Sequence, residues 1–179
     1  IQDSTNINRF SENDKYIFML DGYLSGISLD NKYFQNKITS LFENKNQKME
    51  DVEGEYNIII YSKETNKLLI VNDKLGTRSI YYTIHNNTCV FASEKKIIFN
   101  ILRKKPLISN KGLMEFFLFS HPLEMNDIFE SIKVLPPASC LLVSKDDKIN
   151  INRYWYPEVS ERYSQKEIQD KLCSAVENY

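Results

Sequence analysis

The chain has 179 residues, of which 42% are hydrophobic and 26% charged, proportions that are typical of a single globular domain. Its 23 basic and 24 acidic residues are interspersed and leave a net charge of −1, so no surface of one sign is expected to recruit nucleic acid or anionic lipid. No apolar run approaches the roughly 20 residues that cross a bilayer, and the first ten residues lack the apolar centre of a signal peptide. We expect a cytoplasmic protein without a nucleic-acid or membrane partner.

The cysteines and histidines form no pattern that marks a catalytic or metal site. Cys89, Cys140 and Cys173 are odd in number and lack C-x-x-C spacing, which argues against a disulfide framework or a zinc site. Each has apolar neighbours, so we expect buried, inert thiols. His85 and His121 have no Cys, Ser or Asp in triad or metal-ligand spacing, and no glycine-rich phosphate-binding loop occurs. The residues alone predict neither a metal nor a cofactor in this chain.

The amino-terminal third predicts one strand and one helix after a polar beginning. Residues 1–14 are polar and indicate a loop or a trailing end. Residues 15–20 predict a buried strand that Asp21 and Gly22 end with a turn. Between Asp30 and Asp51 the spacing of the apolar residues predicts a helix that packs one face on a sheet; this face comprises Tyr33, Phe34, Ile38, Leu41 and Phe42.

The stretch from residue 53 to residue 94 predicts four strands in two hairpins. The expected strands are residues 56–61, 68–71, 79–84 and 88–92, and each pair is separated by a polar loop of hairpin length. Gly76 supplies the backbone freedom for the turn of residues 73–78 between the pairs. Because connections this short join antiparallel strands, we expect one continuous meander.

The remaining chain alternates helices and strands. Ser93 is the expected N-cap of a helix through Leu102 that turns Ile97, Ile98 and Ile101 inward. Residues 111–119 predict a second helix, whose core-forming side chains are Leu113, Phe116, Phe117 and Leu118. Strands follow at residues 139–144 and 149–151, so the fold class is α+β with antiparallel sheets.

The carboxy-terminal residues predict a separate amphipathic helix. Ser164 and Glu167 have the spacing of a capping box. Beyond them Ile168, Leu172 and Val176 recur at helical spacing and form an apolar stripe. A stripe of this kind at the end of a chain, after a polar linker, is expected to pack on a partner surface outside the domain.

Several motifs in one order resemble the amino-terminal domain of the asparagine synthetase family. They are Gly54 to Tyr61, then Asn72-Asp73-x-x-Gly76-x-Arg78-x-x-Tyr81, then Ala92-Ser93-Glu94-Lys95-Lys96, and finally Ile128 to Ala138 and Arg153-Tyr154-Trp155. The resemblance covers residues 16–179. That domain is a class II glutamine amidotransferase with the N-terminal-nucleophile fold, so the resemblance implies an α-β-β-α sandwich of antiparallel sheets.

The resemblance also implies how the chain is divided. Residues 1–157 correspond to the glutaminase-like domain; about fifty residues that the family has before the Asp21-Gly22 position are missing, and two explanations stay open, removal of the native amino terminus or a segment that is short in this branch. Residues 158–179 correspond to a linker and the first helix of an ATP-dependent synthetase domain that the chain does not contain. ATP and Mg²⁺ belong to that domain, which is the expected partner. A homodimer is compatible with the resemblance.

The same comparison implies an altered glutaminase site. The family uses the thiol of an N-terminal Cys as nucleophile and its α-amino group as base, whereas residue 1 here is Ile. Asp21, Gly22 and Tyr23 stand where the family has N-G-E, whose Asn and Gly stabilise the oxyanion. The G-S-D and R-H-R-G-P motifs that hold glutamine are missing. The resemblance therefore implies a vestigial site at residues 21–23, no catalytic residue in this chain, and a structural role for Asp73, Gly76, Arg78, Ser93 and Glu94.

Several functions stay open on the sequence. The first is the amino-terminal domain of an amide-forming ligase with a degenerate glutamine site. A second is a working glutaminase that supplies ammonia once an upstream Cys is present. A third is a relative of β-lactam synthetases or lasso-peptide cyclases, and a fourth is a stand-alone binding module. Glutamine or another small molecule is the candidate ligand.

Overall fold

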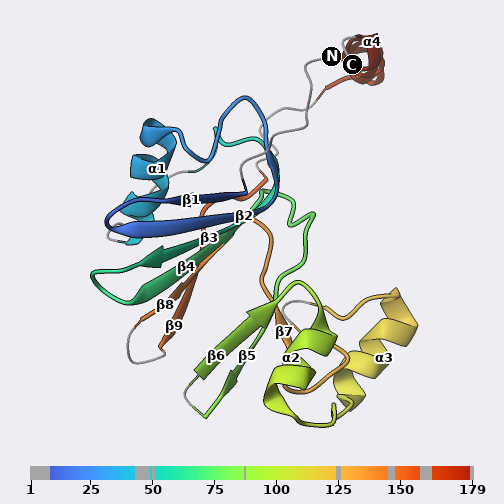
Figure 1. Cartoon of the computed structure of the whole chain (residues 1–179). Helices are drawn as coiled ribbons and strands as arrows, with labels where there is room; N and C mark the ends of the chain where they lie inside the picture. The colour runs from blue at the N-terminus through green and yellow to red at the C-terminus, as the bar shows by residue number, and fades with distance from the viewer. Residues whose placement is uncertain are drawn as a thin grey trace.

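The computed structural model describes residues 9–42, 49, 51–86, 88–123, 126–144, 148–157 and 163–177. Within these residues the strands are β1 (Phe10–Glu12), β2 (Tyr16–Leu24), β3 (Gly54–Ser62), β4 (Lys67–Asn72), β5 (Tyr81–His85), β6 (Thr88–Ala92), β7 (Lys133–Val134), β8 (Ser139–Val143) and β9 (Ile149–Arg153). The helices are α1 (Lys32–Thr39), α2 (Lys95–Leu102), α3 (Asn110–Phe119) and α4 (Gln165–Glu177), and a short 3₁₀ turn, η1 (Ser40–Phe42), follows α1 (Figure 1).

The strands form two antiparallel sheets. The large sheet has the order β1-β2-β3-β4-β8-β9, and the small sheet has the order β6-β5-β7. The β-branched run of β3 pairs with β4 in the register Ile59↔Ile70, and Ile70 pairs in turn with Leu141 of β8. Residues 73–138, which contain the whole small sheet, are thus inserted between two neighbouring strands of the large sheet.

Helix α1 packs on one face of the large sheet. Phe18 of β2 and Ile58 of β3 are fully buried together with Phe34 and Ile38 of α1. The Asn31 Oδ1 accepts a hydrogen bond from the Phe34 N–H and begins the helix. Leu41 is buried as expected, but Tyr33 is 69% exposed, because the helix is rotated so that this residue faces water.

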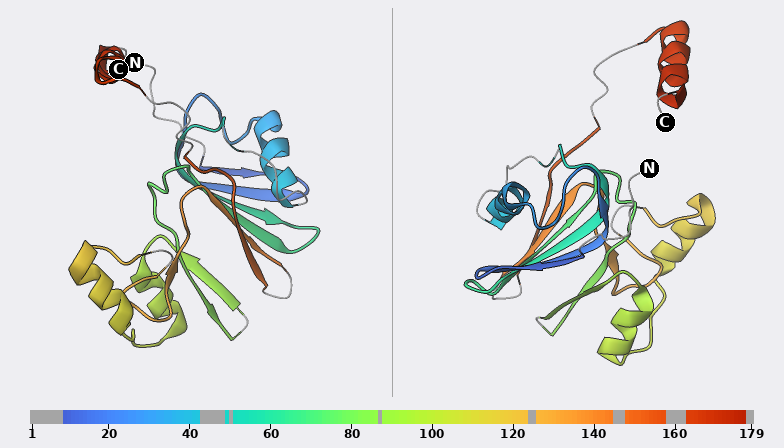
Figure 2. Two further views of the ribbon diagram at one scale, coloured as in Figure 1. Left: turned by 180° about the vertical axis from the view of Figure 1, so that it is seen from behind. Right: turned by 45° about the horizontal axis from the view of Figure 1, so that its top comes forward.

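The opposite face of the large sheet packs on the small sheet. Ile70, Leu141 and Val143 form a buried cluster with Ile80, Tyr82 and Leu135. Helix α2 covers the outer side of the small sheet and buries Ile98 (Figure 2). The layers are therefore α1, large sheet, small sheet and α2, which confirms the predicted α+β fold, an α-β-β-α sandwich of antiparallel sheets.

The expected single meander is wrong. β3 and β4 belong to the large sheet, whereas β5 and β6 belong to the small one, so β4 does not pair with β5. The chain changes sheets in residues 73–80, where the Asp73 carboxylate binds the amides of the following turn and prevents a direct return. The prediction assumed that two strands joined by a short connection pair with each other, but such a connection can also lead from one sheet to the other.

Two expectations for the amino-terminal strand need correction. β2 does not end at Asp21 and Gly22 but continues to Leu24, and Gly22 pairs with Tyr56 at a φ of 111°. The polar segment of residues 1–14 includes the edge strand β1, which pairs Ser11 with Phe18; residues 1–8 lie outside the described part. Residues 43–48 and 50 of the predicted helix region also lie outside it.

Helix α2 begins one residue later than expected. Glu94, not Ser93, occupies the N-cap position, and its side chain makes no capping hydrogen bond. Ile98 is fully buried, but Ile97 and Ile101 are 39% and 58% exposed. The helix thus contacts the small sheet along a narrower stripe than its three isoleucines suggest.

Helix α3 turns most of its large apolar side chains outward, so the prediction that they fill a core is wrong for Phe116, Phe117 and Leu118, whereas Leu113 is half-buried. The residues of α3 that are buried are Gly112 and Glu115, and a Cβ on Gly112 would lie 2.2 Å from the Asp127 carbonyl oxygen. The Glu115 carboxylate accepts a hydrogen bond from the Leu123 N–H. The contact face is therefore small and polar, and it leaves an exposed apolar surface made of Met114, Phe116, Phe117, Leu118 and Phe119.

Helix α4 lies apart from both sheets in all views (Figures 1 and 2). The Glu167 carboxylate accepts hydrogen bonds from the N–H and hydroxyl of Ser164, which confirms the predicted capping box. Ile168, Leu172 and Val176 are 47%, 61% and 76% exposed. No described helix is both long and apolar enough to cross a membrane.

Candidate functional site

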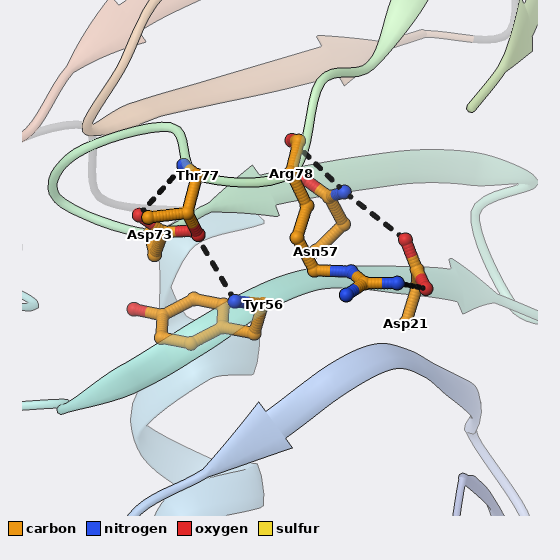
Figure 3. Close-up of polar contacts among 6 residues, drawn as sticks. All are labelled: Asp21, Tyr56, Asn57, Asp73, Thr77 and Arg78. Atoms are coloured by element: carbon orange, nitrogen blue, oxygen red, sulfur yellow. Dashed lines mark hydrogen bonds and ion pairs between the residues drawn. The ribbon is translucent and has the colours of Figure 1, made fainter. Parts of the chain in front are cut away.

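The turn of residues 73–78 is built around one buried carboxylate. Asp73 is 2% exposed, and its side chain accepts hydrogen bonds from the N–H groups of Leu75 and Thr77 at 2.9 and 3.2 Å. The Thr77 hydroxyl donates to the same carboxylate at 2.6 Å, and the Tyr56 N–H of β3 donates at 3.2 Å (Figure 3). The carboxylate thus joins the turn to the large sheet and fixes where the chain leaves β4.

Gly76 allows this turn to approach a second segment closely. Its φ is 62°, and a Cβ there would lie 3.1 Å from the Pro137 Cγ. The Asp73 carbonyl accepts hydrogen bonds from the N–H groups of Gly76 and Ala138 at 3.1 and 2.9 Å. The turn therefore holds the entry to β8 as well as the exit from β4, and a side chain at Gly76 would disturb both.

Arg78 and Asp21 form an ion pair that faces solvent next to this turn. The Arg78 Nη2 lies 2.7 Å from the Asp21 Oδ1, and the two side chains are 43% and 37% exposed (Figure 3). The Asn57 Nδ2 donates to the Arg78 carbonyl at 3.2 Å and to the Asp21 Oδ2 at 3.4 Å. The hydrogen bond from Arg78 lowers the pKa of Asp21 against the opposing effect of burial. Asp21 is therefore an ionised carboxylate with its acceptor atoms already engaged.

Gly22 is held under the arginine side chain. A Cβ at Gly22 would lie 2.0 Å from the Glu55 carbonyl oxygen and 2.9 Å from the Arg78 Cδ. The aliphatic part of Arg78 consequently rests on the Gly22 backbone while its guanidinium reaches Asp21. Tyr23 follows in β2 opposite Glu55 and is 44% exposed.

Three polar residues that were not predicted as site residues support the site, although all three lie within the motifs that carry the resemblance. The Asn72 Nδ2 donates to the Pro136 carbonyl at 2.7 Å, and its Oδ1 accepts from the Ser139 N–H at 2.7 Å. The Tyr154 hydroxyl donates to the Asn72 carbonyl at 2.6 Å. Asn57 and Asn72 are buried polar residues in otherwise apolar strands. A polar residue within an apolar strand is expected to need a hydrogen-bond partner, and this was the sequence feature that could have identified them.

The structure brings together some of the predicted motif residues and separates others. Asp73, Gly76 and Arg78 share one turn beside Asp21 and Gly22, whereas Ser93 and Glu94 lie at the start of α2. There the Glu94 carboxylate pairs with Lys96 at 2.7 Å. No group of His, Cys, Asp and Glu in the described residues could hold a metal ion.

Neither Cys140 nor Cys173 provides a nucleophile for this site. Cys140 is buried in β8, and burial raises the pKa of its thiol to about 12, so the reactive thiolate is suppressed. Cys173 lies on α4 and is exposed, and Cys89 of β6 is only partly buried, so the expectation that every cysteine is buried is correct for Cys140 alone. The described site thus offers a carboxylate–guanidinium pair and a rigid turn.

Comparison with known proteins gives consistent similarities. The family model of the glutamine amidotransferase domain matches residues 38–155. The chain is 32% identical to the glutamine-hydrolyzing asparagine synthetase 3 of Bacillus subtilis over 117 residues, 65% of this chain and 19% of that protein. A protein of Methanocaldococcus jannaschii provisionally named glutamine-hydrolyzing asparagine synthetase 1 is 27% identical over 122 residues, 68% of this chain and 19% of that protein.

The chain spans about a fifth of the length of these curated relatives. Among solved structures, the glutamine phosphoribosylpyrophosphate amidotransferase of B. subtilis, complexed with ADP and GMP, aligns with a TM-score of 0.47 and 13% identity. That alignment covers 82% of this chain and 31% of the other.

Proposed function

Since this chain belongs to the family of glutamine amidotransferase domains, we propose that it is the amino-terminal domain of an ATP-dependent, amide-forming ligase in which the glutamine site no longer works. The similarity to asparagine synthetases supports the ligase, although asparagine need not be the product. The ion pair between Asp21 and Arg78 is the observation that supports loss of glutamine hydrolysis.

The argument concerns the oxyanion that forms when a nucleophile attacks the glutamine amide. In the family the side-chain amide of an Asn and the N–H of the next Gly stabilise this charge. Asp21 occupies the Asn position, and an ionised carboxylate accepts hydrogen bonds but cannot donate them. Its engagement with Arg78 holds it in that ionised form. Loss of one oxyanion donor lowers the rate by about 10² to 10³.

The proposal is tested by the nitrogen source of the full-length native protein. With ATP, Mg²⁺ and aspartate, ammonium chloride should support amide formation, and glutamine should support less than about one hundredth of that rate. Glutamate release from glutamine at about one per second, abolished by thiol alkylation, would show that the site works. Amide formation within a substrate that carries its own amine, without added ammonium, would instead indicate a cyclase or a β-lactam synthetase.

The proposal assigns ATP and Mg²⁺ to a synthetase domain beyond this chain and α4 to the first helix of that domain. The exposed stripe of Ile168, Leu172 and Val176 supports this, because an apolar face on a capped helix is stabilised by burial. In the 179-residue chain the amides of residues 165–177 should exchange rapidly. Slow exchange in the monomer would mean that α4 already has its partner within the chain. A cytoplasmic location is part of the same proposal.

A further inference from the structure

Two adjoining cavities meet at β5, away from the Asp21–Arg78 pair: the first lies between the two sheets, and the second lies between β5 and α2. The first has a volume of about 510 Å³ and is lined by Tyr82, Thr83, Ile84, Ser131, Lys133, Ile149 and Ile151. The second has a volume of about 300 Å³, and Thr83, Ile84 and Ser131 line it as well. Because only the first cavity has a wall in each sheet, we call it the inter-sheet cleft; the second cavity is its neighbour on the side of α2.

The cleft is separate from the candidate glutaminase site. Its wall in the large sheet is β9, which forms one edge, whereas Asp21 lies in β2, next to the other edge. Along β5 the cleft begins at Tyr82 and extends toward the hairpin, away from Arg78. A ligand in the cleft would therefore leave the ion pair untouched.

The walls of the cleft are apolar, with a few polar groups. Ile84 is 57% exposed there, and Ile149 and Ile151 are partly buried beneath it. On the side of α2 the second cavity adds Phe99, Leu102 and Leu107. The Thr83 and Ser131 side chains supply hydroxyl groups. Volumes of about 300 to 1,000 Å³ with apolar walls and few polar groups are typical of small-molecule sites.

The charges around the cleft are mainly positive. Lys133 lines the first cavity, Lys104 and Lys105 line the second, and Glu130 is the acidic residue beside them. None of these lysines forms an ion pair with another residue in the part of the chain that is described. The chain as a whole has a net charge of −1, so this local excess does not follow from its composition. This local excess of positive charge favours binding of an anionic ligand.

We propose that the inter-sheet cleft binds a small apolar carboxylate, an aliphatic or aromatic acid whose hydrocarbon part lies on Ile84, Ile149 and Ile151. Its carboxylate is held by Lys133, with Thr83 or Ser131 as hydrogen-bond donors. The two isoleucines of β9 and the lysine of β7 approach the ligand from different sheets. Binding therefore bridges the sheets, and it is independent of how the protein obtains nitrogen.

Octanoate is a suitable probe for the 179-residue chain, observed by amide chemical shifts. The shift changes should centre on residues 83, 84, 131, 149 and 151. Acetate, which lacks the hydrocarbon, and octyltrimethylammonium, which reverses the charge, should each bind at least about tenfold more weakly, the ratio for roughly 1.4 kcal/mol. Equal binding of the cation would overturn the proposal.

Variants separate the cleft from other surfaces. Lys133→Glu should weaken octanoate binding about tenfold or more, whereas Lys32→Glu, the same charge change on the exposed start of α1, should not. Ile84→Trp should fill the cleft and abolish binding while the unfolding temperature is retained. If octanoate instead perturbs α3, and Phe117→Asp removes binding, the ligand is held by an exposed apolar surface and the proposal is wrong.

Discussion

Replacing Asp73 with Ala should strongly destabilise the domain, because its carboxylate accepts four hydrogen bonds while 2% exposed. The Tyr56 N–H belongs to a fully buried residue and would lose its partner on this side, at a cost of about 1–3 kcal/mol. The turn donors of Leu75 and Thr77 can reach water in part. The unpaired Tyr56 N–H and the lost hydrogen bonds to the charged carboxylate should together lower the free energy of unfolding by about 3–5 kcal/mol.

Urea and thermal unfolding, followed by the fluorescence of Trp155 and by circular dichroism, measure this change. For a domain of this size the unfolding temperature should fall by roughly 6–20 °C. Asp73→Asn, which retains one accepting oxygen, should cost less, about 1–3 kcal/mol. Asp51→Ala is the matched control, since its carboxylate pairs with Lys37 but is 63% exposed, and such pairs contribute at most about 1 kcal/mol. Equal stability of Asp73→Ala and Asp51→Ala would refute the reasoning.

Three further predictions concern the site and the thiols. Gly22→Ala should lower the unfolding temperature, because the added Cβ would lie 2.0 Å from the Glu55 carbonyl oxygen and because the backbone φ of 111° is strained for alanine. An unchanged unfolding temperature would contradict this contact. Iodoacetamide should alkylate Cys173 well before Cys140, whose pKa burial raises to about 12, and mass spectrometry of the labelled peptides decides between them. Because the pKa of Asp21 is lowered in the folded protein, its carboxylate stabilises the fold at pH values above 3.8, the usual pKa of Asp, and this stabilisation is lost as the pH falls through the folded pKa. The stability difference between the wild type and Asp21→Asn should therefore shrink in acid urea titrations, and a constant difference would exclude that linkage.

Much of the sheet structure is predictable from local pattern. β3, β4 and β6 lie within two residues of their predicted bounds, because apolar β-branched runs between polar loops have few alternatives. The assignment of each strand to a sheet is not decided by local pattern. A four-residue loop pairs β3 with β4 in one sheet, whereas a longer turn carries the chain from β4 into the other sheet. Which of these two outcomes a connection gives depends here on the groups that the Asp73 carboxylate binds. The sandwich itself was predicted by resemblance to a family.

The exposed face of α3 shows a second limit. An apolar helix of ten residues has the composition of a buried one, and only its neighbours decide whether it is covered. Here Gly112 and Glu115 make the contact, because a glycine permits backbone approach and the glutamate caps a loop amide. The large side chains are consequently turned to water.

Asp21, Gly22, Asp73, Gly76 and Arg78 were named from the sequence, but their contacts with one another were not predicted. Asp21 and Arg78 lie 57 positions apart, and their ion pair depends on how β2 and the turn after β4 are placed by β3. Asn57, which donates to both, was missed because its neighbours in β3 are apolar. Local propensity carries no information on contacts of this range.

The insertion of the small sheet between β4 and β8 also governs how the chain can fold. The Asn72 side chain binds the backbone of Ser139 across 67 positions, whereas four residues close the hairpin of β3 and β4. Closing the longer loop costs about 2.5 kcal/mol more in chain entropy, unless the inserted residues have already become compact. Strands β2 to β4 can therefore form early, but β8 must wait for the small sheet. The Asn72 contacts should belong to the late part of the folding reaction, where their removal accelerates unfolding and leaves the folding rate nearly unchanged.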